Sequence, residues 1–104
     1  MERIIFFKNY IKYVKEIKSL LSNRLKNFKV YVFGSVVRGD YSIGLSDIDI
    51  AIVSDDFESR EKKLEIYDLL FEKYFDTPFE FHLLTERAWK FYKRFIGDDE
   101  IIEV

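Results

Sequence analysis

Residues 28–53, FKVYVFGSVVRGDYSIGLSDIDIAIV, decide the fold, because two short apolar runs flank a segment rich in turn-forming residues. The first run, residues 28–33, is β-branched and aromatic and stops at Gly34, as expected of a short buried strand. The second run, residues 47–53, alternates between two sets of residues, which is typical of a strand with two different faces. We therefore predict two strands joined by a turn-rich connection.

The connection itself predicts a short helix followed by a loop. Ser35 can cap this helix, which would run to about Val37 or Arg38, and Gly39-Asp40 would end it. Residues 40–44 would then form the loop before the second strand.

Three more helices and one more strand are expected outside this segment. Apolar residues recur at three- and four-residue spacing over residues 3–25 and 58–75, which indicates two amphipathic helices. Residues 79–84 alternate as a strand, and residues 85–95 predict a last helix with Thr85 as its cap and Gly97 after its end. The expected apolar faces are Ile4, Phe7, Ile11, Val14, Ile17, Leu21 and Leu25 in the first helix and Leu64, Tyr67, Leu70, Phe71 and Tyr74 in the second.

The element order α-β-α-β-α-β-α predicts an α/β (α+β) fold in which helices cover a sheet. A length of 104 residues, 48% hydrophobic and 35% charged, fits one small domain over residues 1–104 and excludes a disordered chain. The lack of cysteine excludes disulfides and thiolate metal sites and agrees with a cytoplasmic location. No apolar run is long enough to predict a membrane span.

Charge is unevenly distributed along the chain. Residues 1–29 carry eight Lys or Arg against two Glu, whereas the rest is acidic and the net charge is −2. Lys8, Lys12 and Lys15 share one face of the first predicted helix. This stripe is either a solvated face or a surface for an anionic protein or nucleic acid.

Two carboxylates of the second strand give the main chemical signal. Asp47 and Asp49 share one face, with Cα atoms about 6.5 to 7 Å apart, so both can reach one pair of metal ions. Such neighbours repel each other unless a divalent cation balances them, and oxygen ligands favour Mg²⁺ or Mn²⁺ over zinc. An Asp-x-Asp in isolation also occurs in solvated turns, but the flanking Ile48 and Ile50 argue against that alternative.

Glu80 is the one acidic residue of the third predicted strand and lies between Phe79 and Phe81. A charge in so apolar a setting is costly unless it lies at an edge, is paired or binds a cation. Glu80 is therefore a candidate third metal ligand and proton acceptor, with an exposed edge-strand glutamate as the alternative. His82 shares its face, and a structural role is the simpler interpretation of this single histidine.

The turn after the first strand has the residue types of a phosphate site. Gly34 allows close approach of the backbone, Ser35 offers a hydroxyl and a helix-start N–H, and Arg38 can reach the same anion. An ordinary strand-to-helix turn is the alternative. Ser46, just before Asp47, could contact phosphate or cap the turn, and we favour the cap.

The last predicted helix is apolar around much of its circumference. Part of this surplus is expected to pack against the basic first helix, and the rest to form an interface with a second copy or another protein. The residues concerned are Trp89, Phe91, Tyr92, Phe95 and Ile96.

These residues together resemble the DNA polymerase beta nucleotidyltransferase superfamily. The resemblance covers roughly residues 28–84 and rests on Phe33-Gly34-Ser35, on Asp47-Ile48-Asp49-Ile50 after a spacer of eleven residues, and on the strand-borne Glu80. The small size and the form Gly-Ser-x-x-Arg-Gly are most similar to the minimal nucleotidyltransferases, the MNT proteins.

The resemblance implies a mixed sheet, two Mg²⁺ ions on Asp47, Asp49 and Glu80, and NTP phosphates near Gly34 and the residues after it. It implies transfer of a nucleoside monophosphate to a hydroxyl, with ATP as the expected donor. A helical HEPN toxin is the implied partner and acceptor, for which the chain would be the antitoxin.

Two departures from the family pattern affect the site. Glu80 stands where Asp is frequent, so its reach is one methylene longer, and Val36 and Val37 replace a charged residue and an alanine. The alternative to an enzyme is an antitoxin that neutralises its partner by occlusion. A nucleic-acid-binding domain that uses Lys8, Lys12, Lys15 and Lys18 is the less favoured third hypothesis.

Overall fold

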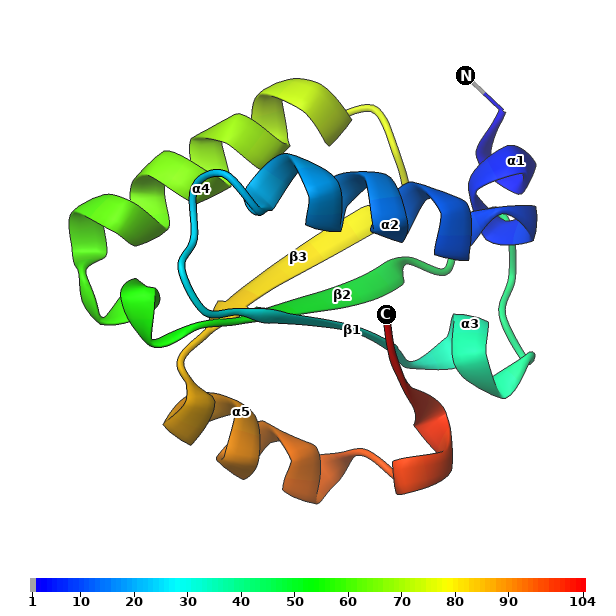
Figure 1. Cartoon of the computed structure of the whole chain (residues 1–104). Helices are drawn as coiled ribbons and strands as arrows, with labels where there is room; N and C mark the ends of the chain where they lie inside the picture. The colour runs from blue at the N-terminus through cyan, green and yellow to red at the C-terminus, as the bar shows by residue number, and fades with distance from the viewer. Residues whose placement is uncertain (1) are drawn as a thin grey trace.

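The computed structural model describes residues 2–104 as a four-stranded sheet with helices on both faces (Figure 1). Short 3₁₀ turns at Asp55–Glu58, Lys93–Phe95 and Asp98–Glu100 link some of the elements. The helices are α1 (Arg3–Lys8), α2 (Tyr10–Leu21), α3 (Ser35–Arg38), α4 (Arg60–Tyr74) and α5 (Glu86–Tyr92), and the strands are β1 (Lys29–Phe33), β2 (Ile48–Val53), β3 (Phe79–Leu84) and β4 (Ile101–Glu103).

The sheet is mixed and has the order β3-β2-β1-β4. Strand β1 runs antiparallel to both β2 and β4, whereas β2 and β3 are parallel and are connected through α4. In this register Asp49 lies opposite Phe33 on one side and Glu80 on the other. The α+β fold with a mixed sheet is therefore confirmed.

The two faces of β2 are buried by different helices, as its alternation predicts. Ile48, Ile50 and Ile52 belong to the larger core cluster, which also contains residues of α1, α2 and α4. Ala51 belongs to a smaller cluster on the opposite face, where Trp89 of α5 is buried. Figure 1 shows α2 and α4 on one side of the sheet and α5 on the other.

This placement corrects one expectation about the last helix. Its apolar surplus does not pack against the basic first helix, because the sheet lies between α5 and α2. Trp89 instead stacks on Tyr31 of β1, with ring centroids 4.8 Å apart, while Phe91 and Phe95 remain largely exposed.

The first helix is also interrupted, although the sequence predicts one helix over residues 3–25. Asn9 has a non-helical backbone conformation, and both its amide side chain and its backbone N–H donate to the carbonyl of Ile5. The backbone bond is the ordinary helical one, whereas the side-chain bond shares its acceptor, and the backbone of Asn9 (φ −123°, ψ 26°) separates α1 from α2. The helix then ends at Leu21, so Leu25 is buried from the following turn.

The apolar face predicted for α4 is partly wrong. Leu64, Tyr67 and Phe71 are exposed, and the buried residues are Ile66, Leu70 and Tyr74. Both stripes have helical spacing, and packing on the sheet decides which one is buried. Thr85 caps α5 as predicted, by accepting a hydrogen bond from the backbone N–H of Ala88 at 3.2 Å.

Residues 98–104, an acidic segment, contain a strand that local sequence patterns do not predict. Strand β4 pairs with β1, with Ile101 opposite Phe33, and Val104 donates its backbone N–H to Val30. Within residues 2–104, none of the helices is both long and apolar enough to cross a membrane.

Candidate active site

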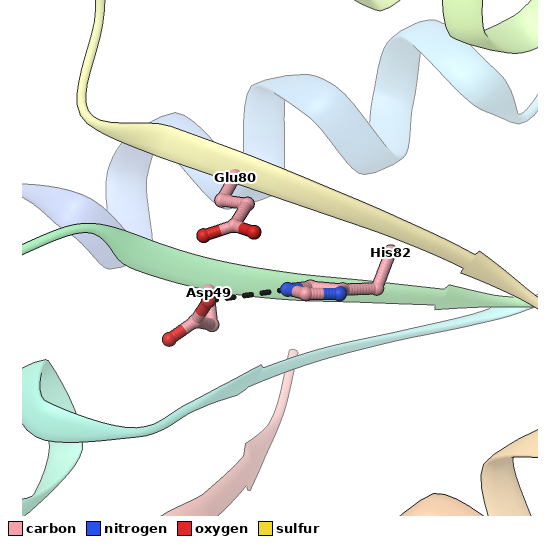
Figure 2. A group of neighbouring side chains, drawn as sticks. All are labelled: Asp49, Glu80 and His82. Carbon is pink, nitrogen blue, oxygen red and sulfur yellow. Dashed lines mark hydrogen bonds and ion pairs between the residues drawn. The ribbon is translucent and has the colours of Figure 1, made fainter.

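The register of the parallel pair β2–β3 builds the site. Asp49 and Glu80 are direct partners on neighbouring strands, and strand alternation directs both side chains to the same face of the sheet. Figure 2 shows the two side chains as members of one group on the neighbouring strands that carry them. The structure therefore brings together two acids that lie thirty-one positions apart in the sequence.

His82 completes this group, two residues beyond Glu80 on β3. Its Nε2 lies 3.1 Å from Oδ1 of Asp49, in the contact drawn as a dashed line in Figure 2. The register partner of His82 is Ala51, whose small side chain leaves room for the ring to lean toward Asp49. The ring packs between Phe33, at 5.3 Å, and Tyr92, at 5.7 Å, and these contacts fix its orientation.

Gly34 presses directly against the same carboxylate. Its φ of +90° lies in the region that side chains rarely adopt, and a Cβ added here would lie 2.7 Å from Oδ2 of Asp49. Glycine is thus required both by the backbone conformation and by the neighbouring carboxylate. The turn after β1 and the acids of β2 and β3 form one continuous site.

The electrostatics of the cluster show a concentration of negative charge. Partial burial raises the pKa of Glu80, and the negative charge of Asp49 raises it further. Asp47 acts in the same direction, whereas His82 lowers the pKa. Glu80 therefore ionises less readily than a free glutamate.

Asp47 lies just before β2 and is exposed, so it is less tightly placed than Asp49. Asp47 and Glu80 both line a pocket of about 410 Å³ that opens between α4 and the end of the sheet. The other walls are aromatic and come from α4 and β3, with the exposed Phe71 and Phe75 among them. The two acids thus adjoin a pocket with aromatic walls that is able to hold a reaction partner.

The predicted phosphate residues are placed less uniformly. Ser35 does not cap α3, because Gly34 occupies the N-cap position and Ser35 is the first residue of the helix. Arg38 is exposed and pairs with Asp40 at 3.2 Å and with Glu100 at 3.5 Å. Gly39, with φ of +85°, ends α3 as predicted.

Ser46 has the capping role that we favour over phosphate contact. Its hydroxyl accepts a hydrogen bond from the backbone N–H of Ser42 at 2.8 Å and closes the loop before β2. Arg3 of α1 donates to the carbonyls of Ile43 and Ser46, which ties the first helix to this loop. These contacts position the chain immediately before Asp47.

The donor set suits a divalent cation. Asp49, Glu80 and His82 each offer a ligand atom, and these atoms lie within 4.8 Å of one another. Carboxylate oxygens are the preferred ligands of Mg²⁺ and Mn²⁺, and a cation would balance the charge that raises the pKa of Glu80. The residues present therefore fit a metal ion.

Sequence reasoning missed the contribution of His82 to this group. The signal was present, since His82 shares the strand face of Glu80, but the single histidine had a simpler structural interpretation. Only the strand register shows that its neighbour across the sheet is the small Ala51 and that Asp49 is within reach.

Comparison with known proteins gives one family and two similar crystal structures. The model of the nucleotidyltransferase domain family matches residues 11–100. One similar crystal structure is that of a proposed nucleotidyltransferase, with 49% sequence identity and a TM-score of 0.74. The match covers 92% of the present chain and 98% of the chain in that crystal structure. A second one, from Sulfolobus solfataricus, is 25% identical over the whole chain and 85% of its own length, with a TM-score of 0.63. The search of curated proteins gave no match.

Proposed function

Because this chain belongs to the nucleotidyltransferase domain family, we propose that it transfers a nucleoside monophosphate from an NTP to a hydroxyl group. The observation that carries the proposal is the contact of three parts: Gly34 at the turn, Asp49 on β2 and Glu80 on β3. A turn suited to phosphate thus lies against carboxylates suited to metal, as nucleotidyl transfer requires.

In the proposed reaction, the acceptor oxygen attacks the α-phosphorus while the bond from this phosphorus to the bridging oxygen of the β-phosphate breaks. Pyrophosphate leaves, and the acceptor proton passes to a carboxylate, for which Glu80 is the candidate. In-line displacement requires the attacking and leaving oxygens on opposite sides. We assign the triphosphate to the Gly34 and Ser35 side and the acceptor to the pocket beside Asp47 and Glu80.

Asp47, Asp49 and Glu80 are the proposed metal ligands, for two Mg²⁺ ions or for Mn²⁺. When bound, the ions supply Lewis-acid activation of the acceptor and charge neutralisation of the triphosphate. Arg38 is the candidate for a further phosphate contact, because its ion pairs with Asp40 and Glu100 are exposed and thus readily exchanged.

The donor and the acceptor are proposed more specifically as ATP and a protein hydroxyl, with a HEPN-type helical protein as partner. The aromatic walls of the pocket support a protein acceptor, because aromatic residues are enriched at protein interfaces. Together these assignments describe an MNT-type antitoxin that adenylylates its toxin.

Label transfer to the partner tests this function. The chain would be incubated with a purified HEPN-type helical protein and each of the four [α-³²P]NTPs, with Mg²⁺ or Mn²⁺. We expect covalent label on the partner from ATP, stoichiometric pyrophosphate release, and neither with EDTA. Tight binding of the partner without label from any NTP would reject the enzyme in favour of the second candidate.

That second candidate is a binding module that neutralises its partner by occlusion. The observation that favours it is the pair of exposed aromatic clusters, Phe71 with Phe75 on α4 and Phe91 with Phe95 after β3. Exposed aromatics of this kind are typical of interfaces. The second cluster is also our candidate surface for association of two copies of the chain.

A further inference from the structure

His82 gives the candidate metal site an unusual donor for a site expected to hold magnesium. Nε2 lies 3.1 Å from Oδ1 of Asp49, and the donors of Asp49, Glu80 and His82 lie within 4.8 Å of one another. Adjacent ligands of a six-coordinate ion with bonds of about 2.1 Å are about 3 Å apart. The imidazole and the carboxylate are therefore already spaced as two ligands of one ion.

The protein holds the ring in this place by packing. Phe33 of β1 and Tyr92 of α5 contact the imidazole from two elements, and the opposing residue in the register is the small Ala51. The side chain of His82 is only 18% exposed, so little rotamer freedom is lost when Nε2 binds a ligand. The ring is preorganised toward the carboxylates.

The chemistry of the donors determines which cation benefits. Mg²⁺ prefers oxygen ligands, whereas imidazole nitrogen favours first-row transition metals, with affinity rising from Mn²⁺ to Cu²⁺ and still higher for Zn²⁺ than for Mn²⁺. One nitrogen with two carboxylates, on Asp49 and Glu80, is a mixed set that such metals accept. Resting on the proposed function, we propose that Asp49, Glu80 and His82 form a mixed nitrogen and oxygen site that selects a divalent transition metal over Mg²⁺.

The single histidine of the chain makes ligation directly observable. The tag-free, ¹⁵N-labelled protein would be titrated with Zn²⁺ and with Mg²⁺ while the two imidazole nitrogens are followed by long-range ¹H–¹⁵N correlation. We expect Zn²⁺ to shift the Nε2 signal far more than the Nδ1 signal, and Mg²⁺ to shift neither strongly. An unshifted imidazole at saturating Zn²⁺ would overturn the proposal.

Two variants separate ligation from hydrogen bonding. His82→Ala removes both, whereas His82→Gln retains an amide that can donate to Asp49 but lacks the imidazole lone pair. We expect both variants to bind Zn²⁺ at least tenfold more weakly, to bind Mn²⁺ more weakly by a smaller factor, and to keep Mg²⁺ affinity within about twofold. Full recovery of Zn²⁺ affinity in His82→Gln would show that His82 acts only by positioning Asp49.

The outcome is distinguishable from failure of the proposed function. If the chain binds nucleotide with Mg²⁺ but the His82 imidazole binds neither Zn²⁺ nor Mn²⁺, the proposed mixed site is wrong and the proposed nucleotidyl transfer is not contradicted. If Zn²⁺ binds through His82 but no NTP is bound with any metal, the proposed function is wrong and the metal site stands.

Discussion

Gly34 and Asp49 depend on each other, and this contact defines the site at the scale of single residues. The glycine backbone leaves space for the Asp49 carboxylate that no other residue would leave, and the carboxylate in turn contacts His82 on its other oxygen. Each oxygen of Asp49 therefore faces a different part of the site. A small side chain at Gly34 should therefore displace the carboxylate of Asp49 while the protein still folds.

Replacement of Gly34 by alanine tests this dependence. Gly34→Ala should destabilise the fold by about 1–3 kcal/mol through backbone strain and should also displace Asp49, which weakens Mn²⁺ binding at least tenfold. Gly39→Ala is the matched control, because Gly39 has a similar φ of +85° but nothing within 4 Å of an added Cβ. Urea unfolding and Mn²⁺ titration measure both effects. Equal loss of Mn²⁺ affinity in the two variants would assign the effect to strain alone.

Glu80 predicts a pH dependence in the metal-free protein. Its pKa is raised above the ordinary value of 4.5, so the folded state disfavours the ionised form. The free energy of unfolding should therefore fall as pH rises from the unfolded pKa through the folded one, and Glu80→Gln should remove this loss. In EDTA, the variant should match the wild type below pH 4 and exceed it in thermal midpoint at pH 7.

The exposed Glu72→Gln on α4 controls for the removal of one negative charge. The raised pKa of Glu80 would be contradicted if Glu80→Gln increased the thermal midpoint equally below pH 4 and at pH 7. It would also be contradicted if Glu72→Gln gave the same increase.

At the scale of elements, the sheet separates two aromatic surfaces. Phe71 on α4 lines the pocket beside the acids, whereas Phe91 belongs to α5, on the opposite face of the sheet. Their exposures are almost equal, at 61% and 60%, so they differ in place and not in accessibility. We assign the Phe71 surface to binding of the acceptor and the Phe91 surface to self-association.

Serine substitutions at these two phenylalanines are reciprocal controls. Phe71→Ser should reduce label transfer to the partner about tenfold without changing the sedimentation coefficient of the isolated chain. Phe91→Ser should lower self-association in sedimentation velocity and leave transfer near the wild-type rate. Both should change stability by only about 0.5 kcal/mol, since both side chains are largely exposed. If Phe71→Ser instead lowered self-association and Phe91→Ser lowered label transfer, the two surfaces would have the opposite roles.

At the scale of the whole molecule, local sequence patterns predict the strands and their faces but not their partners. The alternation around Asp49 and Glu80 places each acid on a defined face, and both faces agree with the structure. That the two acids are neighbours depends on strand order and register, which arise from long-range packing. The contact of His82 with Asp49 likewise depends on strand order and register.

The wrong predictions about the helices also concern interactions that apolar periodicity does not show. Asn9 interrupts the first helix with a non-helical backbone conformation and a side-chain hydrogen bond to Ile5, although the apolar periodicity continues across it. On α4, the stripe with Tyr67 and the stripe with Ile66 both suit a helix, and only packing against the sheet selects the second. Strand β4 forms because it can pair with the edge of β1 that β2 leaves open. The sequence of residues 98–104 contains no information about this edge.

The central claim is that Asp49 anchors a metal-dependent nucleotide site, and calorimetric titration with α,β-methylene-ATP tests it on the isolated chain. We predict binding that requires Mg²⁺ or Mn²⁺ and weakens at least tenfold in Asp49→Asn, which keeps the size of the side chain but removes its charge. Asp68→Asn, an exposed carboxylate of α4, should bind like the wild type. Binding that is independent of metal, or equally tight in a folded Asp49→Asn variant, would contradict the account.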